Sequence, residues 1–128
     1  MVSNKPTTSE LEILDILWEK KSATVRDIHD EISKRKPTAY TTVLKLLQIM
    51  HEKGLVRRDE KGKAHIYRTA RSQEQTQKRL VSDLLEKAFR GSALKLVQHV
   101  LETKPATSEE LAAIRRLIRE AEEKGINK

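Results

Sequence analysis

Basic side chains gather in the middle of this 128-residue sequence, and the chemistry open to them is the binding of anions. The whole chain has 26 Lys and Arg against 19 Asp and Glu, a net charge of +7. Residues 34–68 alone carry 10 basic and 3 acidic side chains, whereas residues 1–33 carry a net charge of −3 and residues 69–128 one of +3. Because Lys and Arg neutralise phosphates, a localised excess of this size favours nucleic acid as the partner.

Part of this charge lies on a predicted hairpin. After residue 54 the helical period ends, and residues 55–58 and 64–68 are two short strand candidates. Gly62 lies in the connection between them, which indicates a tight turn. Neighbouring side chains of a strand point to opposite faces, so Arg57 and Arg58 cannot both enter the core. Charged side chains can protect an edge strand from pairing with other chains, but this explains only part of the accumulation of basic residues on the hairpin. The candidate phosphate ligands are Arg57, Arg58, Lys61 and Lys63, with Arg68 close by.

A second set of candidate residues lies on the helix predicted from about residue 38 to residue 53. Its inward face is predicted from Val43, Leu44, Leu47 and Met50, which recur at helical spacing. Threonine can bond a phosphate or a base edge, lysine can reach guanine or phosphate, and tyrosine can donate to the backbone. The outward candidates are Tyr40, Thr41 and Lys45, flanked by Thr38 and Thr42, with Lys34, Arg35 and Lys36 before the helix as candidates for backbone contacts. The alternative interpretation is that the outer face of this helix is only solvated and does not contact DNA, and that Thr38 caps the start of the helix.

Catalysis and metal binding find little support in the sequence. The absence of cysteine excludes disulfides, thiolate metal sites and cysteine nucleophiles. The four histidines, His29, His51, His65 and His99, do not recur at metal-ligand spacing. No glycine-rich phosphate loop or pair of nucleophile and base is visible. We therefore expect no enzymatic activity, no cofactor and no metal ion.

Three helices and the hairpin must position the candidate residues. Thr7 with Glu10 and Thr24 with Asp27 have the spacing of capping boxes, which predicts one helix to about Lys20 and a second that stops at residues 34–37. With the third helix and the hairpin, the order is that of a winged helix-turn-helix, in which the third helix faces DNA and the hairpin is the wing. We therefore predict a DNA-binding domain over residues 1–70.

Residues 71–128 are predicted to form a second, helical domain. Apolar stripes recur at helical spacing over residues 73–89, 92–101 and 107–125. Helices of this total length are too short to bury their own stripes as an independent core, so we expect a second copy of the chain to cover them. The predicted dimerisation residues are Leu80, Val81, Leu84, Leu85, Phe89, Leu96, Val97, Val100, Leu101, Leu111, Ile114, Leu117 and Ile118. The fold class is thus mainly α, a winged helix followed by three dimerisation helices.

Membrane insertion and secretion are not expected. Only 37% of the residues are hydrophobic, and no apolar run is long enough to cross a bilayer. The N-terminus lacks the apolar core of a signal peptide. We expect a soluble, cytoplasmic protein.

Several strings of this sequence, in their order and spacing, resemble the penicillinase-repressor family of bacterial transcription factors. The match covers nearly the whole chain. The strings are Thr8-x-Glu10-Leu11-x-Ile13-Leu14 with Leu17-Trp18, Ala39-Tyr40-Thr41-Thr42-Val43, His51-Glu52-Lys53-Gly54-Leu55-Val56-Arg57-Arg58, Ile66-Tyr67, Gly91-x-x-x-x-Leu96-Val97 and Leu111-x-x-Ile114-x-x-Leu117-Ile118.

The resemblance implies a homodimer that binds a palindromic operator and blocks transcription, with Thr41 and Thr42 at the start of the recognition helix. In the antibiotic-responsive members a protease cuts an Asn-Phe bond, and this sequence has His99 and Val100 at the matching place. The copper-responsive members use a C-terminal cysteine cluster, which is absent here. The upstream sensor is therefore not identified by the resemblance, and sensing of copper through thiolates is excluded.

Two alternative functions remain open at this point. A winged helix can bind another protein, and its basic face would then serve an acidic partner. A regulator that responds to a small molecule between its two domains would keep DNA binding but differ in its inducer.

Overall fold

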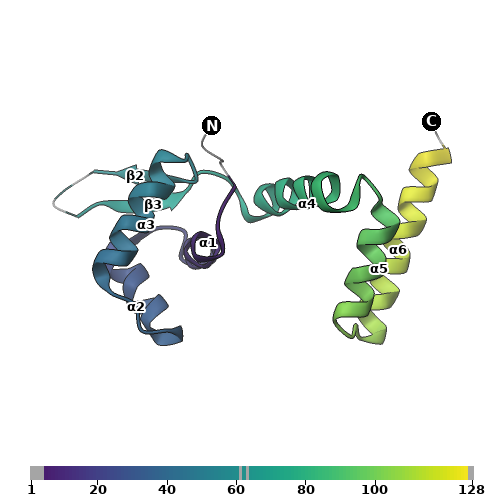
Figure 1. Ribbon diagram of the computed structural model, residues 1–128, viewed down its shortest axis with the longest axis horizontal. Helices are drawn as coiled ribbons and strands as arrows, with labels where there is room; N and C mark the ends of the chain where they lie inside the picture. Colours follow the sequence, from purple (N-terminus) through teal and green to yellow (C-terminus); the bar gives the residue numbers. More distant parts are fainter. Residues whose placement is uncertain (1–4, 61, 63, 127–128) are drawn as a thin grey trace. The chain divides into compact units, whose positions relative to one another are not determined.

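The structure, a computed structural model, describes residues 5–60, 62 and 64–126. It folds as two compact units, Met1–Ser82 and Asp83–Lys128, which we call the first and the second unit. The described elements are mainly helical with one small sheet, which confirms the predicted fold class (Figure 1). In chain order they are α1 (Thr8–Lys20), β1 (Ala23–Thr24), α2 (Val25–Arg35), α3 (Tyr40–Glu52), β2 (Val56–Asp59), β3 (Ile66–Thr69), α4 (Gln73–Phe89), α5 (Ala93–Thr103) and α6 (Ser108–Ile126).

The division between the units falls inside α4, at Ser82 and Asp83. The boundary predicted at residue 70 coincides instead with the change from sheet to helix, between the end of β3 and the start of α4. Among the described residues, no helix is long and apolar enough to cross a membrane.

Capping boxes open the first two helices, as predicted. At α1 the Thr7 hydroxyl accepts the Glu10 amide N–H at 3.2 Å, and the Glu10 carboxylate accepts the Thr7 amide N–H at 2.8 Å. Thr24 and Asp27 make the same reciprocal pair at the start of α2, at 3.2 and 3.1 Å. Each box satisfies two amide donors that a helix start would otherwise leave without partners.

The start of α3 differs from the prediction. The helix begins at Tyr40, and its N-cap residue Ala39 offers no side chain for capping. The Thr38 hydroxyl donates to the Lys36 carbonyl at 2.9 Å, which closes the turn before the helix. The alternative reading of Thr38 as the helix cap is therefore wrong, because its hydroxyl is used for this turn.

A three-stranded antiparallel sheet supports the helices, in the order β1-β3-β2. The predicted hairpin is present as β2 and β3, whereas β1 was not predicted. Ala23 of β1 pairs with Tyr67, and Thr24 pairs with Ile66. A strand of two residues has no period of its own, and the Thr24 side chain also caps α2, so the sequence pattern around it indicates only a helix start.

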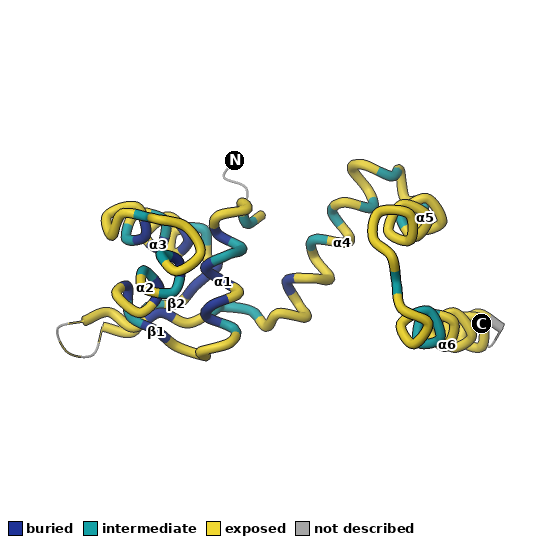
Figure 2. Tube along the Cα trace, turned by 90° about the horizontal axis from the view of Figure 1, so that it is seen from below, coloured by how far each residue is buried: buried dark blue, intermediate teal, exposed yellow. Residues whose placement is uncertain are grey.

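One hydrophobic core lies inside the first unit, between the sheet and the three helices (Figure 2). On α3 the side chains of Val43, Leu47 and Met50 are fully buried, which confirms the predicted inward face, and Leu44 packs at its edge. Tyr67 fills the centre of the sheet and is 1% exposed. The core therefore fixes which side of α3 remains available to solvent.

A buried ion pair joins the two ends of this core. Lys53, the C-cap residue of α3, places its Nζ 2.6 Å from the Glu10 carboxylate at the start of α1. Glu10 is 2% exposed, and the same Nζ donates to the Lys5 carbonyl at 3.0 Å. Burial of a charge is costly unless it is paired and hydrogen-bonded, and Glu10 is paired with Lys53 and bonded to Thr7.

These contacts shift the ionisation of Glu10. Burial acts to raise the pKa of its carboxyl, but the hydrogen bond from Lys53 and those from Thr7 outweigh burial and hold the pKa below its ordinary value. The unfolded chain therefore binds this proton at a higher pH than the folded chain does. It follows that the contribution of Glu10 to stability is present at neutral pH and is lost as the pH falls through its titration range.

The second unit has no comparable interior. None of its residues from 83 to 125 is buried, and Figure 2 colours the described residues of α5 and α6 as exposed or intermediate. Leu94 on α5 is 77% exposed and Leu117 on α6 is 64% exposed. A single copy of the chain thus leaves these apolar stripes in water.

We predict that Glu10→Gln lowers the free energy of unfolding by about 3 kcal/mol at neutral pH, because it leaves Lys53 buried without its partner charge. The difference from the unmodified chain should shrink below about pH 4.3, the ordinary pKa of glutamate. Urea denaturation followed by the fluorescence of Trp18 over a pH series measures both effects.

The matched control is Glu19→Gln on the same helix, where the side chain is exposed. This variant should unfold like the unmodified chain at every pH. Equal stability of the Glu10 variant and this control at neutral pH would contradict the assignment.

Candidate nucleic-acid interface

The solvent-facing side of α3 is polar. Thr41 and Lys45, both predicted to face outwards, are exposed on the side opposite the buried Val43 and Leu47. Gln48 continues this stripe and is also exposed. We did not predict Gln48, although its spacing of three and seven residues from Lys45 and Thr41 could have identified it. The stripe offers hydroxyl, ammonium and amide groups, which suit base edges and phosphates.

Tyr40 and Thr42 flank this stripe at the beginning of the helix, as predicted, and both are exposed. No side chain caps α3 within the described residues, and the Thr42 amide already donates to the Ala39 carbonyl at 3.1 Å. The amide groups of Tyr40 and Thr41 at the beginning of the helix are the ones that could donate to a ligand. A helix start of this kind suits a phosphate.

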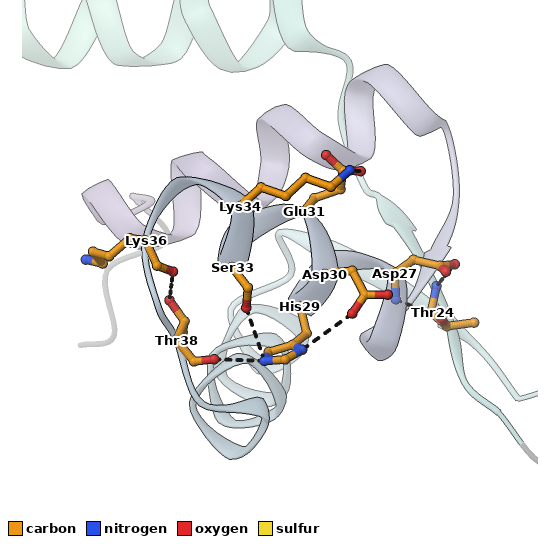
Figure 3. Close-up of polar contacts among 9 residues, drawn as sticks. All are labelled: Thr24, Asp27, His29, Asp30, Glu31, Ser33, Lys34, Lys36 and Thr38. Atoms are coloured by element: carbon orange, nitrogen blue, oxygen red, sulfur yellow. Dashed lines mark hydrogen bonds and ion pairs between the residues drawn. The ribbon is translucent and has the colours of Figure 1, made fainter.

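The segment before α3 is held by α2. His29 of α2 places its Nε2 2.8 Å from the Thr38 carbonyl oxygen (Figure 3). The His29 ring also meets the Tyr40 ring edge-on, with the ring centroids 5.7 Å apart. Lys36 is exposed at the start of this segment, whereas Lys34 pairs with Glu31 at 3.0 Å. Arg35 lies 3.6 Å from the Asp15 carboxylate. Of the basic residues predicted before the helix, Lys36 is therefore the one that faces solvent without an ion pair in the described part of the chain.

The two faces of the hairpin differ sharply. Val56 and Tyr67 point into the core, so Arg57 and its cross-strand partner Arg68 point outwards. Directly opposite residues of antiparallel strands lie side by side, and like charges in such a pair repel each other. Neither arginine makes an ion pair with any other described residue. The register thus places two positive charges side by side on one exposed face.

Arg58 lies on the other face, next to Tyr67. Its Nη2 donates to the Glu60 carboxylate at 3.0 Å, and its side chain is 26% exposed. Hydrogen bonding with the Tyr67 side chain, and then with Glu60, raises the pKa of Arg58 above its ordinary value. The prediction that Arg57 and Arg58 cannot both be buried is confirmed, and Arg58 is the one that the fold engages.

Two further candidates, Lys61 and Lys63, lie outside the described residues. The sequence predicts Arg68 only as a basic residue close to the candidate phosphate ligands. Its pairing with Arg57 could not be predicted, because this pairing depends on a strand register that no local pattern specifies.

The described residues offer little for metal binding or for a deep ligand-binding cavity. The described residues contain no group of three or more His, Cys, Asp or Glu side chains that could hold a metal ion. A shallow cavity of about 270 Å³ lies among α1, the end of α2 and the start of α3, and the residues that line it include Ile32, Pro37 and Leu46. The most developed feature is therefore the polar face of α3 together with the outer face of the hairpin.

Comparison with known proteins supports an assignment to a family. The family model described as penicillinase repressor matches residues 6–120. A transcriptional regulator BlaI of Mycobacterium tuberculosis (strain ATCC 25618 / H37Rv) is 33% identical over 115 residues, which are 88% of this chain and 82% of that protein. The methicillin resistance regulatory protein MecI of Staphylococcus aureus (strain N315) is 22% identical over 112 residues, which are 88% of this chain and 91% of that protein. A penicillinase repressor of Staphylococcus aureus is 21% identical, with 91% and 92% of the two chains covered.

We predict that Arg68→Thr raises the free energy of unfolding by about 0.5 kcal/mol at low ionic strength, because it relieves the repulsion across the strands and introduces a β-branched residue, which suits a strand. Added salt should remove the gain, since it screens the two exposed charges. Denaturation of the two proteins at low and at high salt measures the difference.

The matched change on the inner face is Arg58→Thr, which removes the contacts with Glu60 and Tyr67 and should lower stability instead. If both variants lost stability alike, the assignment of opposite faces would be incorrect.

Proposed function

The chain belongs to the penicillinase repressor family of transcriptional regulators, and on that premise we propose that it acts as a homodimer on a palindromic operator in double-stranded DNA. The predicted absence of enzymatic activity agrees with this family, whose members are regulators and not enzymes. The proposal places the protein in the cytoplasm, where DNA is accessible to it.

The observation that carries the proposal is the pair Arg57 and Arg68, held side by side on the outer face of the hairpin. Neither arginine forms an ion pair with another described residue, and a phosphate between the two guanidinium groups would relieve the repulsion. β2, which bears Arg57, packs against α3. The hairpin and α3 therefore belong to one rigid support for contacts with a duplex.

We divide the roles by chemistry. Thr41 and Lys45, in the middle of the exposed stripe, read base edges in the major groove. Contacts to the backbone of the DNA come from the residues around them and from the hairpin, namely Lys36, Thr38, Tyr40, Thr42, Arg57, Arg58, Lys61, Lys63 and Arg68. In this division base contacts set the sequence preference, and phosphate contacts set the affinity.

Dimerisation is proposed from the exposed stripes of the helical part. Of the predicted dimerisation residues, Val81, Leu84, Val97, Val100, Leu101, Leu117 and Ile118 are exposed, and Leu80, Leu85, Phe89, Leu96, Leu111 and Ile114 are half-buried. Exposed apolar surface of this extent is typical of an interface. A two-fold dimer of residues 71–128 would cover it and would present two copies of residues 1–70 to half-sites roughly 34 Å apart.

The protein-interaction alternative can be separated from this proposal. An acidic protein partner requires only a basic surface, whereas an operator requires discrimination between sequences. Selection of bound duplexes from a randomised library, in the presence of heparin, makes this distinction: an enriched inverted repeat supports the proposal, and no enrichment favours the basic interaction surface. Replacement of Lys45 by Ala should change the enriched sequence.

We predict that Arg57→Ala with Arg68→Ala lowers duplex affinity for all sequences and reduces the slope of log affinity against log salt by roughly 0.9 for each phosphate contact that is lost. Fluorescence anisotropy of the enriched duplex over a salt series measures the slope. The control is Lys104→Ala, a basic residue exposed before α6. An unchanged slope in the double variant would exclude the outer face of the hairpin as a phosphate site.

We also predict that the unmodified chain sediments as a dimer at micromolar concentration, and that Leu84→Asp with Leu117→Asp sediments as a monomer. Both side chains are exposed in the single chain, so the change should leave the core of the first unit intact. Trp18, the only tryptophan, packs against that core and reports its unfolding. A monomeric unmodified chain would contradict the proposed dimer.

A further inference from the structure

We propose that His29 is a positioning residue for DNA binding, which holds the Thr38 carbonyl and thereby fixes the exposed start of α3. This inference rests on the proposed function, since it concerns how the helix that reads DNA is placed. His29 was one of the four histidines for which the sequence indicated no metal site, and no role in the interface was predicted for it.

The start of α3 lacks a side-chain cap of its own. Ala39 has no side chain that could accept an amide N–H, in contrast to Thr7 at α1 and Thr24 at α2. The amides of Thr42 and Val43 donate to the Ala39 carbonyl at 3.1 and 3.3 Å. The first turn is therefore held by the backbone and by whatever fixes the segment that leads into it.

The imidazole of His29 lies among polar groups of α2 and of the segment before α3. The Thr38 carbonyl oxygen lies 2.8 Å from Nε2 and can only accept, so Nε2 donates to it. On the same helix, Ser33 Oγ lies 3.3 Å from Nε2 and Asp30 Oδ1 lies 3.7 Å from Nδ1 (Figure 3). The ring is thus flanked by polar groups of α2 and directed at the chain that enters α3.

The contacts of His29 reach the candidate interface directly. The residue after the N-cap is Tyr40, whose ring meets the His29 ring edge-on with centroids 5.7 Å apart. Tyr40 is 44% exposed, and Thr41 follows it on the outward stripe. His29 therefore supports two positions, Thr38 and Tyr40, on either side of the N-cap residue Ala39. A small displacement here would move the side chains that face the groove.

The test compares two variants of similar size, His29→Gln and His29→Leu, in the full chain. Glutamine keeps an N–H donor that can reach the Thr38 carbonyl, whereas leucine fills the space without a donor. In the protein without DNA, His29→Leu should speed amide hydrogen exchange at Thr42 and Val43, and His29→Gln should restore most of the protection. Trp18 fluorescence establishes that both variants are folded.

The second readout is discrimination between duplexes. The probe is the duplex that the unmodified chain enriches from a randomised library, measured against a scrambled duplex of the same composition. His29→Leu should reduce the affinity ratio about fivefold, the effect of one neutral hydrogen bond, and His29→Gln should recover most of it. Glu19→Ala, an exposed change on α1, is the control and should leave the ratio unchanged.

An unaltered ratio in His29→Leu, or an equal loss in both variants, would overturn the assignment to this hydrogen bond. A chain that enriches no duplex at all would remove the proposed function instead. Exchange at Thr42 and Val43 would in that case still decide whether His29 holds the start of α3, because that readout needs no DNA.

Discussion

The position of α3 is the constraint on which the rest of the first unit depends, and it is fixed at both ends and in the middle. At its C-terminal end the buried pair of Lys53 and Glu10 joins it to α1, and before its N-terminal end His29 joins the Thr38 carbonyl to α2. Between them Val43, Leu47 and Met50 fill the core. Each contact uses a different kind of interaction, and together they leave one polar face of the helix towards solvent.

In the hairpin, one arginine contributes to the fold, whereas two others face each other across the strands. Arg58 is drawn into contacts with Tyr67 and Glu60, whereas Arg57 is set against Arg68 across the strands. A ribbon that was optimised only for stability would not keep two arginines opposite each other. Binding of an anion between the two arginines would explain why the unfavourable pair is kept. The chain belongs to a family of transcriptional regulators, for which DNA phosphates are such anions.

Local patterns were sufficient to predict much of this fold. The capping boxes at Thr7 and Thr24, the inward face of α3 and the hairpin follow from spacing within a few residues. The strand β1 did not, because Ala23 and Thr24 become a strand only by pairing with residues more than forty positions away. The same holds for the site: the facing of Arg57 and Arg68 depends on register, and the contact of His29 with Thr38 depends on the packing of two helices.

As proposed, two copies of this chain place two α3 helices in one duplex. Hydroxyl-radical footprinting of a duplex that the chain selects from a randomised library tests this arrangement. We expect two protected regions related by a two-fold axis, with their centres roughly 10 base pairs or a multiple of this apart. A single protected region without two-fold symmetry, on a duplex that contains no inverted repeat, would rule the arrangement out.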